Sequence, residues 1–372
     1  MDERNKNVID LFAGVGGLSL GAARAGFNVA SAVELDKHAT ALHHKNFPNT
    51  THLVEDVSTL TGSRLLELSS LRKGDLCGLV GGPPCQGFSE IGLRGNSDPR
   101  NELLVHFFRL VAETRPAFFL AENVPGVVQE RNRSILDRAL SLVPSKYVVL
   151  EPMTIKASDY GAPTIRTRVF FFGYDPDRMN PLEVADFAPK LVEDVRVARA
   201  LTGLPIIRSD WQSEAQSWRA VATLGEMFYE DRLANGVPRG VGDLIALDLY
   251  KSKRLVSGFL GTAHSPETKK RFTALKPGMA DPTSKCVRLR MDGYCPTLRA
   301  GTGPERGSYQ AIRPIHPTSP RVIAPREAAR LQGFPDWFQF HPTKWHAFRQ
   351  IGNSVSPIVA EKLMSSIFSR VV

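Results

Sequence analysis

Two side chains that could carry out chemistry follow apolar runs of this sequence. Cys85 lies in "VGGPPCQGFSE" (80–90), just past the run "DLCGLV", and Glu122 lies in "AENV", just past "AFFL". A cysteine reacts as its thiolate, which nearby arginines favour, and a carboxyl group in a pocket could donate a proton to an electron-poor ring. These residue types therefore suit nucleophilic attack on such a ring, assisted by an acid.

A parallel sheet would bring these side chains together, because open α/β sheets place their ligands at the carboxyl ends of their strands. Arg166 and Arg168 precede the apolar run "TRVFFFG" (167–173). If that run is an antiparallel edge strand, its start returns to the same rim. We therefore expect a thiol, a carboxyl group and two guanidinium groups to converge there.

Two other uses of a cysteine fit the sequence poorly. A cysteine hydrolase needs a partner histidine, and none of the nine histidines is evidently paired with Cys85. A zinc deaminase carries HxE and PCxxC, whereas here no histidine has that spacing to a glutamate and Pro84-Cys85 lacks the second cysteine. We expect no metal at the reactive site.

The first 175 residues alternate strand and helix patterns, which predicts an α/β fold: a mostly parallel sheet with helices on both faces. The predicted strands are "NVIDLF" (7–12), "FNVASAVEL" (27–35), "DLCGLV" (75–80), "AFFLAENV" (117–124) and a last strand at 167–173. The predicted helices are "LSLGAARAG", closed by Gly26, then "KHATALHHKNF", and "NELLVHFFRLVAETRP" with one face of Leu103, Phe107, Leu110 and Val111.

A glycine-rich turn, "DLFAGVGGLSLG", follows the first predicted strand. Its glycines at 14, 16 and 17 suit a close backbone approach to a ligand, but Ser19 at the sixth position removes the GxGxxG fingerprint of dinucleotide sites. Glu34 ends the second strand, where an acid can bind a ribose diol. Asp56 follows a third short strand and could accept from an adenine amino group. Together they predict an adenosine ligand without a pyrophosphate.

The positive charge is concentrated in one stretch. Residues 251–320 contain 13 Lys or Arg and 4 Asp or Glu, an excess that equals the net charge of +9 of the whole chain. Such a stretch is typical of a surface that binds a polyanion, although a solvated loop region can have the same composition. No secretory pattern, membrane-length apolar run or cysteine framework is visible, so we expect a reduced cytoplasmic protein in which Cys77 is structural.

The strand–helix alternation weakens beyond about residue 175 and returns near residue 321. A chain of 372 residues indicates about two domains. The end, "SPIVAEKLMSSIFSRVV", predicts an amphipathic helix that packs on the first domain through Val359, Leu363, Ile367 and Val371. The predicted division is a catalytic cofactor-binding domain (1–175), a smaller irregular domain (176–320) and a return segment that completes the catalytic domain (321–372).

The sequence resembles the DNA (cytosine-5)-methyltransferases of the bacterial modification type. The matching segments follow the family's order and span nearly the whole chain apart from the middle insertion: "DLFAGVGG", "VELD", "EDV", "GGPPCQGFS", "RNELL", "AENV", "RTRVFFFG", "PREAARLQGFPDWF" and "QIGNSVSP". The Pro-Cys-Gln and Glu-Asn-Val pair is highly specific. The resemblance implies the Rossmann-like fold of S-adenosylmethionine-dependent methyltransferases, with residues 176–320 as the DNA-recognition domain.

The resemblance also implies a role for each matching residue. Cys85 would attack C6 of a flipped-out cytosine, and Glu122 would hydrogen-bond the ring in a setting shaped by Asn123 and Val124. Arg166 and Arg168 would hold the base carbonyl and a phosphate. The methyl donor would be S-adenosylmethionine, without a metal, and its implied contacts are Phe12, Gly14, Val15, Gly17, Glu34, Asp56, Val57, Pro84, Leu103, Asn353, Ser354 and Val355.

Double-stranded DNA is the implied partner, and the loop "SEIGLRGNSDPRN" (89–101) would close as a lid over the base. We expect a monomer associated with the bacterial nucleoid, and any cognate restriction endonuclease to be a separate polypeptide, since no nuclease motif is visible. One departure is Thr164, where the family usually has the Gln of "QxRxR". Two alternatives stay open: a tRNA cytosine methyltransferase and a non-catalytic DNA-binding homologue.

Overall fold

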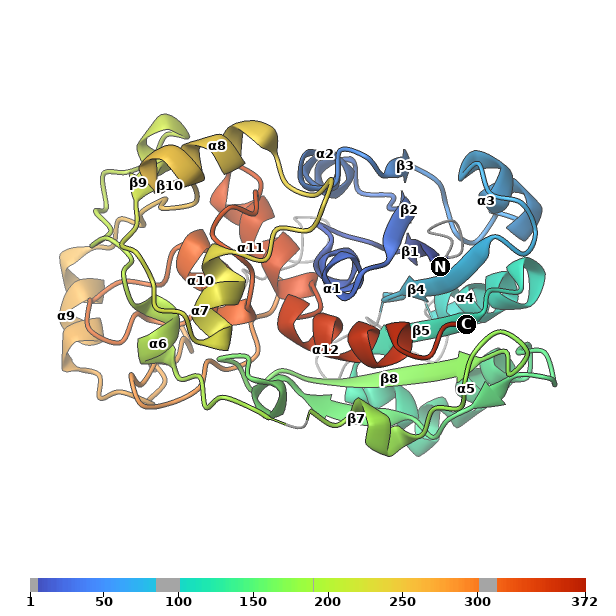
Figure 1. Cartoon of the computed structure of the whole chain (residues 1–372). Coiled ribbons are helices and arrows are strands. Elements are labelled where there is room, and N and C mark those ends of the chain that lie inside the picture. The colour runs from blue at the N-terminus through green and yellow to red at the C-terminus, as the bar shows by residue number, and fades with distance from the viewer. Residues whose placement is uncertain (1–5, 85–100, 190, 301–312) are drawn as a thin grey trace.

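A sheet of eight strands forms one side of the molecule (Figure 1). The computed structural model describes residues 6–84, 101–189, 191–300 and 313–372. The strand order is β3-β2-β1-β4-β5-β8-β6, and β7 also pairs with β8. The strands are β1 (Asn7–Leu11), β2 (Asn28–Val33), β3 (Thr51–Leu53), β4 (Leu76–Gly81), β5 (Phe118–Asn123), β6 (Val148–Val149), β7 (Met153–Lys156) and β8 (Thr167–Tyr174).

The predicted parallel sheet is confirmed, with one correction at its edge. Strands β1 to β5 pair in parallel, and β8 pairs antiparallel with β5. β8 is thus antiparallel, the condition on which the convergence of the arginines depends, but it is not an edge strand, because β6 and β7 pair with its other side. These two strands span only two and four residues, too few for their alternation to stand out in the sequence.

Helices cover both faces of the sheet, as predicted. Along β5, Phe118 and Leu120 pack into one hydrophobic cluster, and Phe119 and Ala121 pack into another, because successive side chains of a strand point to opposite faces. The first cluster includes residues of α1 (Gly17–Ala25), α2 (Lys37–Asn46) and α12 (Pro357–Phe368). The second includes residues of α3 (Gly62–Leu68), α4 (Glu102–Thr114) and α5 (Arg133–Leu140).

Two predicted helix faces need adjustment. In α4 the core position belongs to Leu104, and Leu103 is half-buried, because the buried stripe runs 104, 107, 108 and 111. The last helix, α12, packs against α1 as expected, with Gly21 facing Ala360. It ends at Phe368, so Val371 lies beyond it and forms an isolated bridge with Met179.

The other side of the molecule is built from short elements (Figure 1). Residues 176–320 contribute η6 (Val184–Phe187), α6 (Val197–Leu201), η7 (Ala215–Ser217), β9 (Arg219–Ala220), α7 (Phe228–Ala234), α8 (Leu244–Lys253), β10 (Leu255–Val256) and α9 (Pro266–Ala274). The chain then continues into α10 (Pro325–Gln332), α11 (Lys344–Asn353) and α12. Three further short helices, η3 (Pro125–Val128), η4 (Glu130–Asn132) and η5 (Ala157–Tyr160), lie in the N-terminal half. Among the described residues, no helix is long and apolar enough to cross a membrane.

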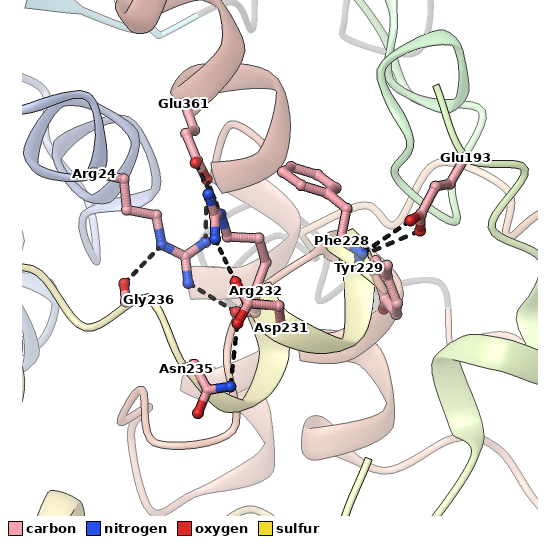
Figure 2. A network of polar contacts seen from close by, with 9 residues as sticks. All are labelled: Arg24, Glu193, Phe228, Tyr229, Asp231, Arg232, Asn235, Gly236 and Glu361. Atoms are coloured by element: carbon pink, nitrogen blue, oxygen red, sulfur yellow. Dashed lines mark hydrogen bonds and ion pairs between the residues drawn. The ribbon is translucent and has the colours of Figure 1, made fainter. Parts of the chain in front are cut away.

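A group of charged side chains, of which Arg24 and Glu361 are buried, joins these two sides (Figure 2). Arg232 of α7 donates through Nε to both carboxylate oxygens of Glu361 in α12, at 2.8 and 3.0 Å. Arg24 of α1 lies 3.6 Å from the same carboxylate and donates to the Arg232 carbonyl at 2.7 Å. Burial lowers the pKa of Arg24 to about 10. The group therefore fastens the middle region to α1 and α12.

Candidate active site

Of the reactive residues predicted from the sequence, Glu122 lies at the carboxyl end of the parallel strand β5, and Arg168 of the antiparallel β8 lies beside it. β1 lies between β2 and β4, so the chain leaves β1 toward one side of the sheet and leaves β4 toward the other. This is the switch point at which open α/β sheets bind their ligands. The glycine-rich turn follows β1, and Pro83 and Pro84 follow β4. Cys85 and the loop 89–100 lie outside the described residues.

Glu122 and Arg168 form the centre of the site. Glu122 is the last residue but one of β5, and its side chain is only 9% exposed. Arg168 comes from the antiparallel β8, and its Nε lies 2.7 Å from Oε1 of Glu122. The two groups form an ion pair that lacks the alignment of a hydrogen bond, since Oε1 accepts none. A carboxylate is thus held at the rim with acceptor capacity left.

The loop that leads to Cys85 lies against this carboxylate. A Cβ atom added to Gly82 would lie 3.2 Å from Oε2 of Glu122, so the absence of a side chain there leaves space at the acid. Asn123 donates through Nδ2 to the Pro83 carbonyl at 3.3 Å, and its Oδ1 accepts from the Val124 amide at 2.8 Å. Asn123 therefore ties the end of β5 to the start of the Pro-Pro loop.

Arg166 and Thr164 connect the same strand region to more distant parts of the chain. Arg166 is buried and donates through Nη1 to the Gly352 carbonyl at 2.9 Å and to the Leu298 carbonyl at 3.5 Å. The hydroxyl of Thr164 donates to the Cys295 carbonyl at 3.0 Å. Thr164, which stands where the family usually has Gln, therefore links the segment before β8 to residues 176–320 through its hydroxyl.

The glycine-rich turn has free space beside Gly14 and is fixed by a hydrogen bond to Glu34. Apart from Gly14 and its two chain neighbours, no atom of the described residues lies within 4 Å of the position that a Cβ on Gly14 would take. The Gly14 amide donates to Oε2 of Glu34 at 2.9 Å, and Oε1 of Glu34 accepts from the Asp36 amide at 2.8 Å. Burial raises the pKa of Glu34. Phe12 beside this turn has φ +57°, a strained value for a non-glycine residue.

The C-terminal segment closes against this turn. A Cβ on Gly17 would collide with the Val355 carbonyl and would touch Cβ of Ser354 at 3.1 Å. Gln332, which was missed in the sequence, donates through Nε2 to the Ser354 carbonyl at 2.8 Å. The only indication of this role in the sequence is that Gln332 is a polar residue within the segment "PREAARLQGFPDWF". Gly17, Ser354 and Val355 are therefore brought together, although more than 330 residues separate them.

The remaining predicted cofactor residues differ in their burial. Asp56 is exposed after β3, and its Oδ1 accepts from the Ser58 amide at 2.8 Å, which lowers its pKa. Asn353 is exposed at the end of α11. Val15 and Val57 are buried, and Leu103 and Pro84 are half-buried.

A chain of buried polar groups under the glycine-rich turn was not predicted. Ser19 donates to Oδ2 of Asp10 at 2.6 Å and lies 3.0 Å from Nε2 of His43, whose Nδ1 is 2.8 Å from Nε2 of His52. Burial raises the pKa of Asp10 to about 7 and lowers that of His52 to about 4. No sequence pattern indicates this set, because its members come from different elements.

Residues 6–369 match the C-5 cytosine-specific DNA methylase family. The chain belongs to this family. The enzyme is 38% identical over 364 residues to the Type II methyltransferase M.XorII of Xanthomonas oryzae pv. oryzae, covering 96% of this chain and 84% of that protein. It is 33% identical to the Type II methyltransferase M.DdeI of Desulfomicrobium norvegicum, covering 97% and 88% of the two chains.

Solved structures agree with this assignment. A prophage-encoded protein of E. coli, assigned provisionally as a DNA modification methyltransferase, superimposes on the enzyme with a TM-score of 0.87 at 49% identity and covers 98% of each chain. The Dnmt2 methyltransferase of S. pombe superimposes with a TM-score of 0.61 at 17% identity, again over 98% of each chain. The second likeness shows a shared fold alone.

Proposed function

We propose that this methyltransferase transfers a methyl group from S-adenosylmethionine to C5 of a cytosine that is flipped out of duplex DNA, through a covalent adduct with Cys85. The observation that carries the proposal is the placement of Glu122. Its buried carboxylate lies at the carboxyl end of β5, paired with Arg168 and next to the Gly82 backbone that leads to Cys85. The glycine-rich turn lies at the adjacent end of β1.

The residues around the glycine-rich turn fit the proposed cofactor. The open side of Gly14 leaves room for a ligand close to the backbone. Glu34 uses one lone pair on each oxygen for backbone amides and keeps the others for a ribose diol. Asp56 is exposed at the end of the neighbouring strand, where it would accept from the adenine amino group. S-adenosylmethionine, when bound, supplies an electrophilic methyl group.

The residues of the rim would then act on the base. The Cys85 thiolate adds to C6, the ring electrons move to C5, and Glu122 hydrogen-bonds the ring nitrogen and amino group of the adduct. Once C5 carries the methyl group, loss of the C5 proton re-forms the C5=C6 double bond, and Cys85 leaves C6 as its thiolate. Arg168 would orient Glu122 and the base carbonyl. Arg166, through its backbone contacts, would hold the segments that surround the base.

We assign DNA contact to residues 176–320, with residues 1–175 and 321–372 together forming the catalytic domain. Basic side chains project from the exposed surface of this middle region, where they can contact phosphates. They are Lys251, Lys253, Lys269, Lys270, Lys276, Lys285, Arg290 and Arg299. We further propose a monomer that acts on nucleoid DNA in the cytoplasm, with any partner endonuclease on a separate chain.

Trapping on 5-fluorocytosine tests the proposed chemistry. Fluorine at C5 cannot leave as a proton does, so the Cys85–C6 adduct should survive on a denaturing gel. Bisulfite sequencing of plasmid DNA exposed to the enzyme first identifies the target cytosine, and the substituted duplex is then built on that sequence. Cys85→Ala should bind this DNA without forming the adduct, and Cys286→Ala, which changes a half-buried cysteine of the middle region, should still form it.

Two results would count against the proposal. One is a folded wild-type enzyme that methylates its site but leaves no adduct with the fluorinated duplex. The other is faster methylation of tRNA than of duplex DNA in a parallel assay, which would assign the site to RNA. Glu122→Gln keeps the shape of the side chain but removes its proton chemistry, so it should slow methylation by about 10²- to 10⁴-fold.

A further inference from the structure

Three histidines from opposite ends of the sequence meet beside the sheet. His38 lies in the first turn of α2, His341 lies just before α11, and His346 lies in the first turn of α11. Each has a ring nitrogen within 4.8 Å of one on both of the others. The centroid of the His346 ring is 4.2 Å from that of His38 and 4.3 Å from that of His341. Three imidazoles thus share one small volume at the junction of two helices.

This junction is held together by bonds that do not involve the imidazole rings. Asn46, at the end of α2, donates to the Gln339 carbonyl and accepts from the Gln339 amide, both at 2.9 Å. Gln350 of α11 donates to the His38 carbonyl at 3.3 Å and accepts from the His341 amide at 3.0 Å. The backbone that carries the three histidines is therefore positioned in advance, as a binding site requires.

We propose that His38, His341 and His346 bind a divalent transition-metal ion such as Zn²⁺, Co²⁺ or Ni²⁺. Neutral imidazole is a preferred ligand of these ions, whereas Mg²⁺ and Ca²⁺ prefer oxygen. Three protein ligands and one position for water make a tetrahedral set. The ion would link α2 to the first turn of α11, whereas Asn353 lies at the last turn of α11. Its expected role is therefore to hold two distant parts of the chain together.

Charged groups of both signs act on His341 and His346. Burial and the two neighbouring imidazoles lower the pKa of His341 to about 4. Burial and His38 lower the pKa of His346. Asp36 opposes both shifts, and Lys45 near His341 and Arg349 near His346 support them.

His341 must change tautomer to take part. Its Nδ1 now accepts from the Thr343 amide at 3.1 Å, so the proton of the neutral ring lies on Nε2. Coordination through Nε2 would require that proton to move to Nδ1, which gives up the hydrogen bond from the Thr343 amide. The Thr343 hydroxyl, 3.0 Å from Nδ1, would then accept a hydrogen bond from the new N–H. A hydrogen bond from the second ring nitrogen is the support that metal-bound histidines usually have.

Cobalt titration of the full-length protein tests this site without cofactor or DNA. The chelator-treated protein should bind one equivalent of Co²⁺ with visible absorption typical of tetrahedral nitrogen and oxygen ligands, and Zn²⁺ should displace it. His38→Gln and His346→Gln should each weaken binding by at least about tenfold. His38 is exposed, so its replacement should leave the fold intact. Zn²⁺ should also raise the Tm of the wild type more than that of either variant.

His44→Gln is the matched control, since His44 is an exposed histidine of the same helix outside the trio, and it should keep wild-type affinity. The proposal is overturned if no stoichiometric Co²⁺ binding occurs. It is also overturned if His44→Gln lowers affinity while His38→Gln does not, or if a thiolate-to-cobalt charge-transfer band shows that a cysteine binds the ion.

Discussion

Replacing Gly17 with alanine would place a methyl group where the folded chain has no space. The new Cβ would lie well under 3.0 Å from the Val355 carbonyl oxygen, a separation that real Cβ atoms essentially never show. The obstacle is backbone, so it cannot rotate away. Gly21, one turn along on the same face of α1, packs tightly against Ala360 of α12, so α1 could make room only by separating from α12. We therefore expect the segment 353–355 to move by roughly half an ångström or more.

A displacement of this size should mainly affect the cofactor. A misplacement of about 1 Å can cost about 10²-fold in rate, so we expect kcat/KM for S-adenosylmethionine to fall by about 10²-fold, or about 3 kcal/mol of transition-state stabilisation. Steady-state methylation and calorimetric titration with the cofactor measure the effect, and circular dichroism establishes that the variant is folded. Overpacking should also lower the free energy of unfolding by about 1–3 kcal/mol.

Two further glycine-to-alanine substitutions distinguish the steric clash at Gly17 from backbone strain. Gly14→Ala meets no atom of the described residues, so its effect on the unliganded protein should be only the strain of φ +56° for a side chain, about 1–2 kcal/mol. Gly225→Ala has neither a positive φ nor a neighbour within 4 Å and should change nothing. A folded Gly17→Ala enzyme with wild-type cofactor affinity and kcat/KM would refute the reasoning, because segment 353–355 could then not belong to the cofactor site.

Three other outcomes are expected. Folding raises the pKa of Asp10 from 3.8 to about 7, so the contribution of Asp10 to stability is full below about pH 4 and is lost as pH rises through 7. Over that range Asp10→Asn should become more stable relative to the wild type, by on the order of a few kcal/mol in chemical denaturation at pH 8. A difference in stability that stays the same between pH 5 and pH 8 would contradict the raised pKa. Glu361→Gln removes the charge that balances the buried guanidinium of Arg24 and the partly buried guanidinium of Arg232, and it should lower the free energy of unfolding by about 3 kcal/mol. Glu67→Gln in an exposed ion pair should change it by less than about 1 kcal/mol, and equal melting temperatures of the two variants would show that the network contributes little. Thr164→Val removes the hydroxyl donor to a buried carbonyl and should cost about 1 kcal/mol in thermal unfolding, and a neutral change would mean that this link is not needed.

The sequence by itself determined the sheet and the order of its parts. Apolar runs of strand length separated by helical patterns require a parallel sheet, and such a sheet places the ends of its strands at one rim. Glu122 and the glycine-rich turn could therefore be assigned to that rim from short segments alone. The C-cap at Gly26 and the burial of Cys77 could also be predicted from the sequence, since both follow from the residues next to them in the chain.

Only the tertiary structure decided which distant residues complete the site. The carbonyl partners of Arg166 lie more than 130 residues away in the sequence, and Gln332 donates to the Ser354 carbonyl from the preceding helix. His38 meets His341 and His346 after about 300 residues. Periodicity reports which face of an element is buried, but not which polar atom of another element it meets. Those pairings follow from how α1, α11 and α12 pack on the sheet, and no local pattern records them.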